Sequence, residues 1–244
     1  MDSTPMRRSK PHGRGKPILK LFVRTQTTGP VRIKAPTIMI LLNTKPFMDN
    51  DKVCRAIEAA AEAGAVACCM DVDHCFDDKG QDCPFAFGQL SHKTEEELAS
   101  YARLARAHGI PFILKGILSA EDVIKAKELG MGGVVASHHK NIWTYSVPPA
   151  MALPELRAAA GKNFPIFADC GVSTGVDVFK YLAVGASAVG VARELMGAFA
   201  KKGADGVYDR IMFLNDELLG TMAKTHCAAV DEIGPGAIRM RVGW

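Results

Sequence analysis

The sequence predicts an α/β fold built on parallel strands, and three observations lead to that class. From residue 50 onward, segments with helical spacing of apolar residues alternate with short runs that are apolar throughout. The short runs show no alternation of apolar and polar residues, which indicates strands buried on both faces. They begin roughly 21–47 residues apart, as expected when each strand is followed by a crossover helix.

Each predicted helix carries its own start or stop signals. A glycine ends each of the first three predicted helices, and a capping box opens the second. A proline is expected in the first turn of the fourth. The segments are DNDKVCRAIEAAAEAG ending at Gly64, KTEEELASYARLARAHG with Thr94 and Glu97, SAEDVIKAKELG with Ser119 and Asp122, LPELRAAAG with Pro154, and GVDVFKYLAVGA.

Six strands are expected, near residues 38–42, 65–72, 112–115, 133–137, 165–168 and 188–192. Polar side chains follow the carboxyl ends of five of these runs: Asp71, Asp73, Lys115, His138, His139, Asp169 and Arg193. In a barrel these ends converge on one mouth, whereas in a doubly wound sheet they spread along an edge. The absence of a GxGxxG turn also weakens the doubly wound alternative. We therefore predict a TIM (β/α)8-type barrel, incomplete at about six recognisable units.

The composition fits one domain preceded by a basic N-terminal segment. The 244 residues are 48% hydrophobic, and no run reaches the roughly 18 apolar residues of a membrane span. Residues 1–34 hold nine Lys or Arg against one acid, a surplus of +8, so the rest of the chain carries −4 of the total +4. We expect 1–34 to be disordered or irregular, with a transit peptide as the alternative, and 35–244 to form the barrel, without a nucleic-acid surface.

The seven cysteines form no paired metal or disulfide framework. Cys68, Cys69 and Cys170 lie in apolar runs and are expected to be small core residues. Cys75 and Cys83 with His74 match no usual zinc spacing, so no metal site is predicted. Without a secretory signal, the sequence favours a cytoplasmic protein with reduced thiols.

The strand ends suggest chemistry before any comparison. A lysine that ends FILKG needs an anion or an electron-rich oxygen beside it. Asp73 and His139 could pair, with the carboxylate orienting the ring so that it serves as a base. The turn DCGVSTG before a helix suits a phosphate, and Arg193 would add a charged donor. These residues together indicate a phosphorylated ligand that extends toward a Lys/His/Asp cluster.

Three motifs in order then resemble the FMN-dependent α-hydroxy-acid dehydrogenases and oxidases, the glycolate and lactate oxidase group. PFILKGILSAEDVIKAKELG is similar to the family's lysine strand and helix, and VVASHHKNIWTYSVPPAMALPEL aligns with its SNHGGRxLDxxPA segment. PIFADCGVSTGVDVFKYLAVGASAVGVAR resembles DGGVRxGxDVFKALALGAxAVxxGR. The resemblance covers about residues 38 to 235.

The resemblance implies FMN as cofactor and a small hydroxy acid as substrate. His139 falls on the catalytic base, Asp73 on the residue that orients it, and Lys115 on the lysine near flavin N1, where negative charge grows on reduction. Flavin contacts would come from Asp71, Lys115, Ser137, Asp169, Cys170, Gly171, Ser173, Ala192 and Arg193.

The chain departs from the family pattern at several positions. Ile142 replaces the arginine that binds the substrate carboxylate, and the second substrate arginine has no counterpart. Ser173 replaces a phosphate-binding arginine, Ala192 a glycine, and Asp71 a threonine. The substrate therefore stays open, and so does an alternative of another class, a truncated non-catalytic relic that acts only in binding or interaction. A third possibility is a phosphate-binding barrel that uses Lys115 as a Schiff base.

Six strands leave two edges where a closed barrel has none. Interior apolar residues of the edge strands, Ile38, Ile40, Val189 and Val191, would then meet water unless something covers them. We expect either a homo-oligomer or a chain in which the N-terminal segment covers these edge strands. We expect no membrane partner.

Overall fold

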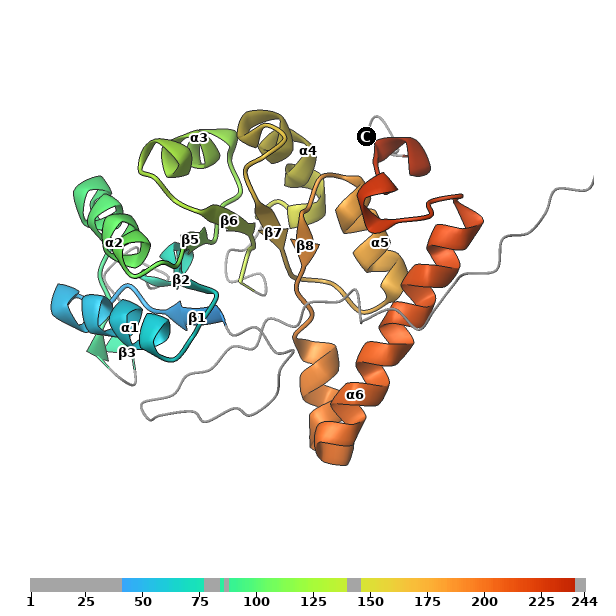
Figure 1. Ribbon diagram of the computed structural model, residues 1–244, viewed down its shortest axis with the longest axis horizontal. Coiled ribbons are helices and arrows are strands. Elements are labelled where there is room, and N and C mark those ends of the chain that lie inside the picture. The colour runs from blue at the N-terminus through green and yellow to red at the C-terminus, as the bar shows by residue number, and fades with distance from the viewer. Residues whose placement is uncertain (1–40, 77–83, 86–87, 140–145, 240–244) are drawn as a thin grey trace, which may run out of the picture.

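The computed structural model describes residues 41–76, 84–85, 88–139 and 146–239. The basic segment 1–34 and the start of the expected barrel domain lie outside these residues. Six strands form a curved sheet, and helices α1 to α5 lie in an arc outside it (Figure 1). The elements are β1 (Leu41–Thr44), α1 (Asn50–Glu62), β2 (Ala67–Asp71), the 3-10 turn η1 (Val72–His74), β3 (Pro84–Phe85), β4 (Gly88–Gln89), α2 (Glu95–Ala107), β5 (Phe112–Lys115), α3 (Ala120–Glu128), β6 (Gly133–Ala136), α4 (Pro149–Ala160), β7 (Ile166–Ala168), α5 (Gly175–Ala183), β8 (Ala188–Val189), α6 (Arg193–Lys224), η2 (Val230–Glu232) and η3 (Pro235–Ala237).

All neighbouring strands of the main sheet are parallel, in the order β1-β2-β5-β6-β7-β8. Chain order and spatial order agree, as in a barrel, and β3 with β4 forms a separate antiparallel pair. Within the part of the chain that the structure describes, β1 and β8 each pair with one strand. The predicted barrel type with six units is confirmed as a half-barrel.

The helix signals act largely as predicted. Thr94 and Glu97 form the capping box of α2, and Ser119 accepts from the backbone N–H of Asp122 at the start of α3. One helix start was wrong: α4 begins at Pro149, and Pro154 lies inside it rather than in its first turn. Pro149 already fits the first helical position because its missing N–H would have no partner there, so the helix begins more than one turn earlier than expected.

Two apolar layers fill the fold. The larger layer packs the outer strand faces against the helices and includes Met70, Phe112, Val134 and Ile166. The smaller layer lies on the inner face and joins Leu41, Ala67, Cys69 and Ile113, with Val135 and Phe167 partly buried against it.

The expectation that Val189 and Val191 would face an open interior was wrong. They are 4% and 7% exposed and belong to the larger layer, on the helix side of the sheet. Because β8 is only two residues long, its alternation could not be judged from the run of apolar letters. Ile38 and Ile40 lie outside the described residues.

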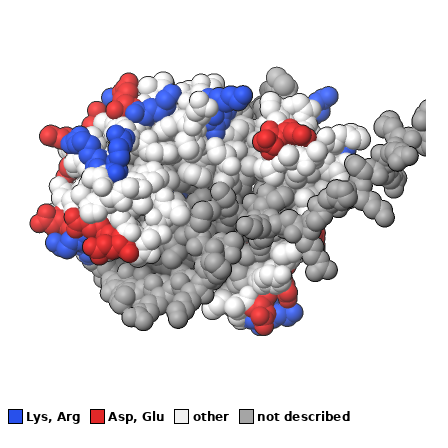
Figure 2. Space-filling model, in the orientation of Figure 1, with Lys and Arg blue, Asp and Glu red and all other residues white. Residues whose placement is uncertain are grey.

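Charged side chains of both signs are scattered over the outer helices on the face in Figure 2. Cys68 and Cys69 are buried as predicted, and burial raises the pKa of Cys68 to about 12. The Cys75 thiol is also buried and donates to the carbonyl of Val72 at 3.1 Å, while Cys83 lies outside the described residues. No described helix is both long and apolar enough to cross a membrane.

Candidate active site

The parallel register places the predicted polar residues side by side at one end of the sheet. Asp71 on β2 is the direct neighbour of Lys115 on β5, and Lys115 in turn neighbours Val135 on β6. Ser137 and Asp169 follow the paired ends of β6 and β7, Ala136 and Ala168. The expected convergence of acids, a lysine and a histidine at the strand ends is therefore present.

Asp71 is fully buried and has two hydrogen-bond partners, one on β1 and one at the residue that follows β1. Its Oδ2 accepts hydrogen bonds from Asn43 Nδ2 at 2.8 Å and from the ammonium of Lys45, which is itself 4% exposed. Burial alone raises the pKa of this carboxyl, but Lys45, then Lys115 and His139, outweigh that effect and lower it to about 2. Asp71 is therefore a buried anion at neutral pH.

Lys115 occupies the centre of the cluster. Its Nζ donates to Ser137 Oγ at 2.6 Å and lies 3.3 Å from Asp169 Oδ2 and 3.6 Å from Asp71 Oδ1. Burial opposes the charged form, but Asp169 and Asp71 overcome it and raise the pKa of Lys115 above its ordinary value. The site therefore holds an ammonium at neutral pH, supported by carboxylates at the ends of β2 and β7.

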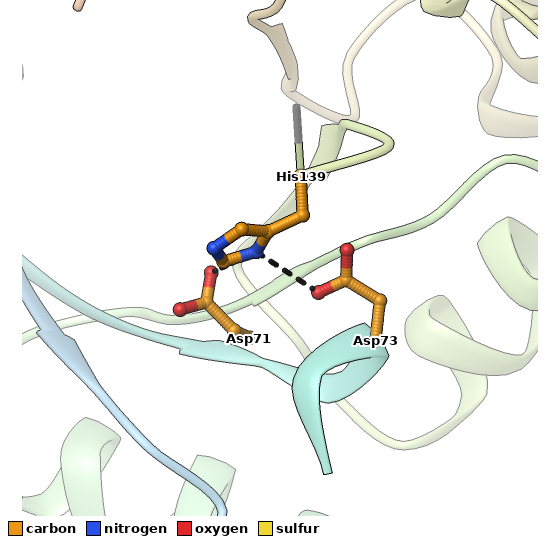
Figure 3. A group of neighbouring side chains, drawn as sticks. All are labelled: Asp71, Asp73 and His139. Carbon is orange, nitrogen blue, oxygen red and sulfur yellow. Dashed lines mark ion pairs between the residues drawn. The ribbon is translucent and has the colours of Figure 1, made fainter. Parts of the chain in front are cut away.

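His139 lies between two carboxylates (Figure 3). Its Nδ1 is 3.5 Å from Asp73 Oδ1 and 3.7 Å from Asp71 Oδ1. Its backbone adopts φ 47°, and its N–H donates to Ser137 Oγ at 3.2 Å, which fixes the turn after β6. The predicted pair of Asp73 and His139 is thus brought together.

Gly116 explains how Asp73 reaches this position. The glycine has φ 103°, and a Cβ built on it would lie 2.5 Å from Asp73 Cγ. Any other residue would clash with the carboxylate and adopt a strained backbone. The glycine that ends FILKG is therefore part of the architecture of the site.

The turn after β7 differs from one prediction. Cys170 was expected to be a core residue, but it is half-buried in the site with φ 72°, because the turn reverses direction there. Its Sγ donates to Asp169 Oδ1 at 3.0 Å and lies 3.7 Å from Ser137 Oγ. The Tyr181 hydroxyl fixes the turn by donating to the Cys170 carbonyl at 2.7 Å.

The backbone donors that open α5 are already engaged by carboxylates. Asp177 Oδ2 accepts from the N–H groups of Ser173 and Thr174 at 3.2 and 2.9 Å, and Glu217 Oε2 accepts from Gly175 N–H at 2.9 Å. Gly171, earlier in the turn, has open space beside it, since a Cβ there would meet nothing within 4 Å. Of the predicted turn, Gly171 is therefore better placed than Ser173 to offer a backbone donor to phosphate.

The start of α6 is a second candidate position for an anion. Ala192 precedes the helix without a side-chain cap, and both it and Arg193 are exposed. Uncapped N–H groups and the helix dipole favour an anion at such a position. Arg210 connects the two parts, because its Nη2 donates at 2.7 Å both to the Ser173 carbonyl and to Glu194 Oε2.

Three ligand-type atoms, Asp71 Oδ1, Asp73 Oδ1 and His139 Nδ1, lie within 4.8 Å of one another. Lys45 and Lys115 already balance the charge of Asp71, and a divalent cation would be placed against both ammoniums. Because like charges disfavour one another strongly where water is excluded, we assign no metal to this cluster.

The sequence did not point to Asn43, Lys45, Arg210 or Glu217. The signal for Lys45 was available, because it follows a buried strand just as Lys115 does. The strand was expected near 38–42, whereas β1 covers Leu41–Thr44, so the polar residue at its end was overlooked.

Comparison with known proteins gives the family. Residues 78–240 match the family model described as FMN-dependent dehydrogenase. The chain is 38% identical over 151 residues to peroxisomal (S)-2-hydroxyacid oxidase GLO4 of Arabidopsis thaliana and 36% identical over 142 residues to L-lactate oxidase of Lactobacillus jensenii. These matches cover 62% and 58% of this chain but only 40% and 35% of the relatives.

Solved structures agree with the sequence matches. A mandelate oxidase variant with a monooxide FMN adduct superposes with a TM-score of 0.71 at 31% identity, over 80% of this chain and 61% of that one. Mandelate oxidase with (S)-2-phenylpropionate gives 0.69 at 29% identity, with the same shares covered. The strand order, the lysine and histidine at the strand ends, and the match over residues 78–240 identify the chain as a member of the FMN-dependent dehydrogenase family.

Proposed function

We propose that this protein binds FMN and oxidises the CH–OH carbon of a small 2-hydroxy acid or a related alcohol. The observation that carries the proposal is the placement of His139, Asp73 and Lys115 within one cluster at the mouth of a half-barrel. A carboxylate-oriented imidazole beside a buried ammonium is suited to remove a proton where negative charge develops nearby. The relatives named as hydroxyacid and lactate oxidases support the same chemistry.

The donor set fits FMN. Gly171 and the uncapped start of α6 with Arg193 would hold the phosphate, and Asp169 would accept from ribityl hydroxyls. Ser137 and Lys115 would lie beside the ring system. Ser173 stands where the family has a phosphate-binding arginine, so one guanidinium is missing beside the FMN phosphate. Arg193 would therefore supply most of the positive charge that binds the phosphate.

The contacts of the side chains support the roles proposed for them. FMN, when bound, supplies the acceptor for the hydride or electron pair at its N5. His139 takes the proton of the substrate hydroxyl, and Asp73 keeps the ring oriented and stabilises its charged form. Lys115 is held protonated by Asp169 and Asp71, so it offers a fixed positive charge. The same contacts disfavour a Schiff base, which requires a neutral amine.

The substrate class is proposed from the relatives, since Lys140, Asn141 and Ile142 lie outside the described residues. A 2-hydroxy carboxylate without the two family arginines must bind through other donors, and weaker binding is expected. This is why the proposal includes alcohols related to 2-hydroxy acids.

Anaerobic mixing of the FMN-loaded protein with glycolate, lactate and mandelate tests the proposal. Bleaching of the flavin absorbance is expected with at least one substrate. His139→Gln should lower the rate about 100-fold or more while FMN remains bound, and His138→Gln serves as the matched control. An FMN-loaded protein that no hydroxy acid or alcohol reduces would instead support the non-catalytic relic.

A further inference from the structure

Asp71 is an additional ionised group in the site. In the family that the motifs resemble, this position carries a threonine, so the roles given to His139, Asp73 and Lys115 do not require a carboxylate here. Nevertheless Asp71 is fully buried, and its Oδ2 is engaged by the nearly buried Lys45 and by Asn43. A buried carboxylate persists only where partners compensate for the lost water.

The two oxygens of Asp71 have separate partners. Oδ2 faces β1, where Lys45 and Asn43 hold it. Oδ1 faces the mouth of the half-barrel and lies 3.6 Å from Lys115 Nζ and 3.7 Å from His139 Nδ1. Within the described residues, Oδ1 accepts no hydrogen bond in the structure, so these two groups are its electrostatic partners.

We propose that Asp71 is a second positioning carboxylate for His139, that it couples this histidine to Lys115 through Oδ1, and that Lys45 is its buried counter-ion. The catalytic importance of this inference rests on the proposed function. The electrostatic interaction of Asp71 with His139 and Lys115 does not depend on it. Lys45 fixes the carboxylate from behind, and Oδ1 can then support a positive charge on either partner.

The geometry distinguishes this role from that of Asp73. Asp73 comes from η1, whereas Asp71 comes from the end of β2 (Figure 3). Asp73 packs against Gly116, and Asp71 is the direct neighbour of Lys115 in the sheet. A single Nδ1–H can be directed at only one oxygen, so the second carboxylate acts through its field. The charged groups around His139 include Asp71 and Asp73 beside its ring, Lys115 and then Asp169 beyond Asp71, and Lys45 behind Asp71.

Two measurable consequences follow. Removing the charge of Asp71 should make the imidazolium of His139 less favourable, so the midpoint of the histidine titration should move to lower pH, by about one unit for a charge within 4 Å. It should also leave Lys115 less neutralised, so an FMN held nearby should show a higher reduction potential. A role limited to folding would change neither quantity.

The variants are Asp71→Asn and the double variant Asp71→Thr with Lys45→Met. Asp71→Asn leaves Lys45 without its counter-ion and could unfold, whereas the double variant removes both charges together. The double variant should shift in the same direction by less, because the carboxylate lies closer to His139 than Lys45 does. Asp122→Asn, which removes a carboxylate at the start of α3, is the control that should leave both readouts unchanged.

The first experiment is an NMR titration of ring-labelled histidines in the protein without added FMN, with the His139 signal assigned by its loss in His139→Gln. The second is a redox titration of the FMN-loaded variants. A lower titration midpoint in the folded double variant supports the coupling, and an unchanged midpoint overturns it. If FMN does not bind at all, the proposed function fails while the histidine titration still decides the coupling.

Discussion

Replacing Lys45 by methionine tests whether the buried ion pair stabilises the fold. The side chains of Lys45 and Asp71 are 5% and 0% exposed, and breaking a buried pair by removing one partner typically costs about 3–5 kcal/mol. Lys115 at 3.6 Å and the hydrogen bond from Asn43 remain, so the expected loss is smaller, about 2–3 kcal/mol. Against a typical net stability of about 5–15 kcal/mol, this loss is readily measured.

The pH dependence gives the prediction its sign. The folded pKa of Asp71, about 2, lies below its ordinary value of 3.8. The carboxylate therefore contributes stability above pH 4, and this contribution is lost as the pH falls through the folded pKa. A shift of this size corresponds to about 2 kcal/mol, which is the net of burial and of the combined effect of Lys45, Lys115 and His139. The difference between wild type and variant should be full at pH 7 and shrink toward pH 2.

Urea unfolding followed by circular dichroism at pH 7 and at pH 3 measures both quantities. Lys125→Met is the control, because Lys125 pairs with Glu95 and Glu128 on the exposed surface, and its replacement should not change stability measurably. A Lys45→Met loss below about 1 kcal/mol, or one equal at both pH values, would refute the assignment of Lys45 as the stabilising counter-ion of Asp71.

Three further predictions concern the backbone, the phosphate end and the sheet edges. Gly116→Ala should destabilise the fold by about 1–3 kcal/mol and, by displacing Asp73, slow flavin reduction. Gly64→Ala is the control: a Cβ there meets open space, so it should lower stability and leave the rate of flavin reduction unchanged. Thermal melts measure the stability of both variants, and stopped-flow kinetics measure the rate. Arg193→Ala should weaken FMN binding by about 1.5–3 kcal/mol in a fluorescence titration. Arg103→Ala, at an exposed position of α2, is the control, and equal affinities of the two variants would contradict the placement of the phosphate. Within the described residues β1 and β8 are the edge strands of the sheet, and such edges should lead to self-association; light scattering that shows a stable monomer at micromolar concentration would count against it.

Much of the fold was accessible from the sequence because its signals are local. Capping residues such as Thr94 act on the next turn of the same helix, and the glycine stops act on the preceding one. The runs that are apolar on both faces predicted parallel strands without knowledge of their partners. Even so, the side chains of β8 were assigned to the wrong layer, because two residues cannot show which face a strand buries.

The candidate site was accessible only in part, for a physical reason. Residues after strand ends are predictable because parallel strands end together, and this principle led to Asp71, Lys115 and His139. Contacts between distant segments have no such signal. Glu217 lies 42 positions from Gly175, yet it accepts from its N–H and changes which part of the turn can receive phosphate.

The charge cluster depends on neighbouring strands and not on a closed barrel. Its members come from the ends of β1, β2, β5, β6 and β7, and each of these strands is paired with the next. The apolar layer beneath them is also shared between neighbours, since Leu41 pairs with Ala67, and Cys69 with Ile113. Whatever lies between β1 and β8 outside the described residues, the alignment of Lys45, Asp71 and Lys115 is therefore set within the six strands. The phosphate end differs, because it lies beside β8 at an edge of the sheet, so closure should affect FMN affinity more strongly than the geometry around His139.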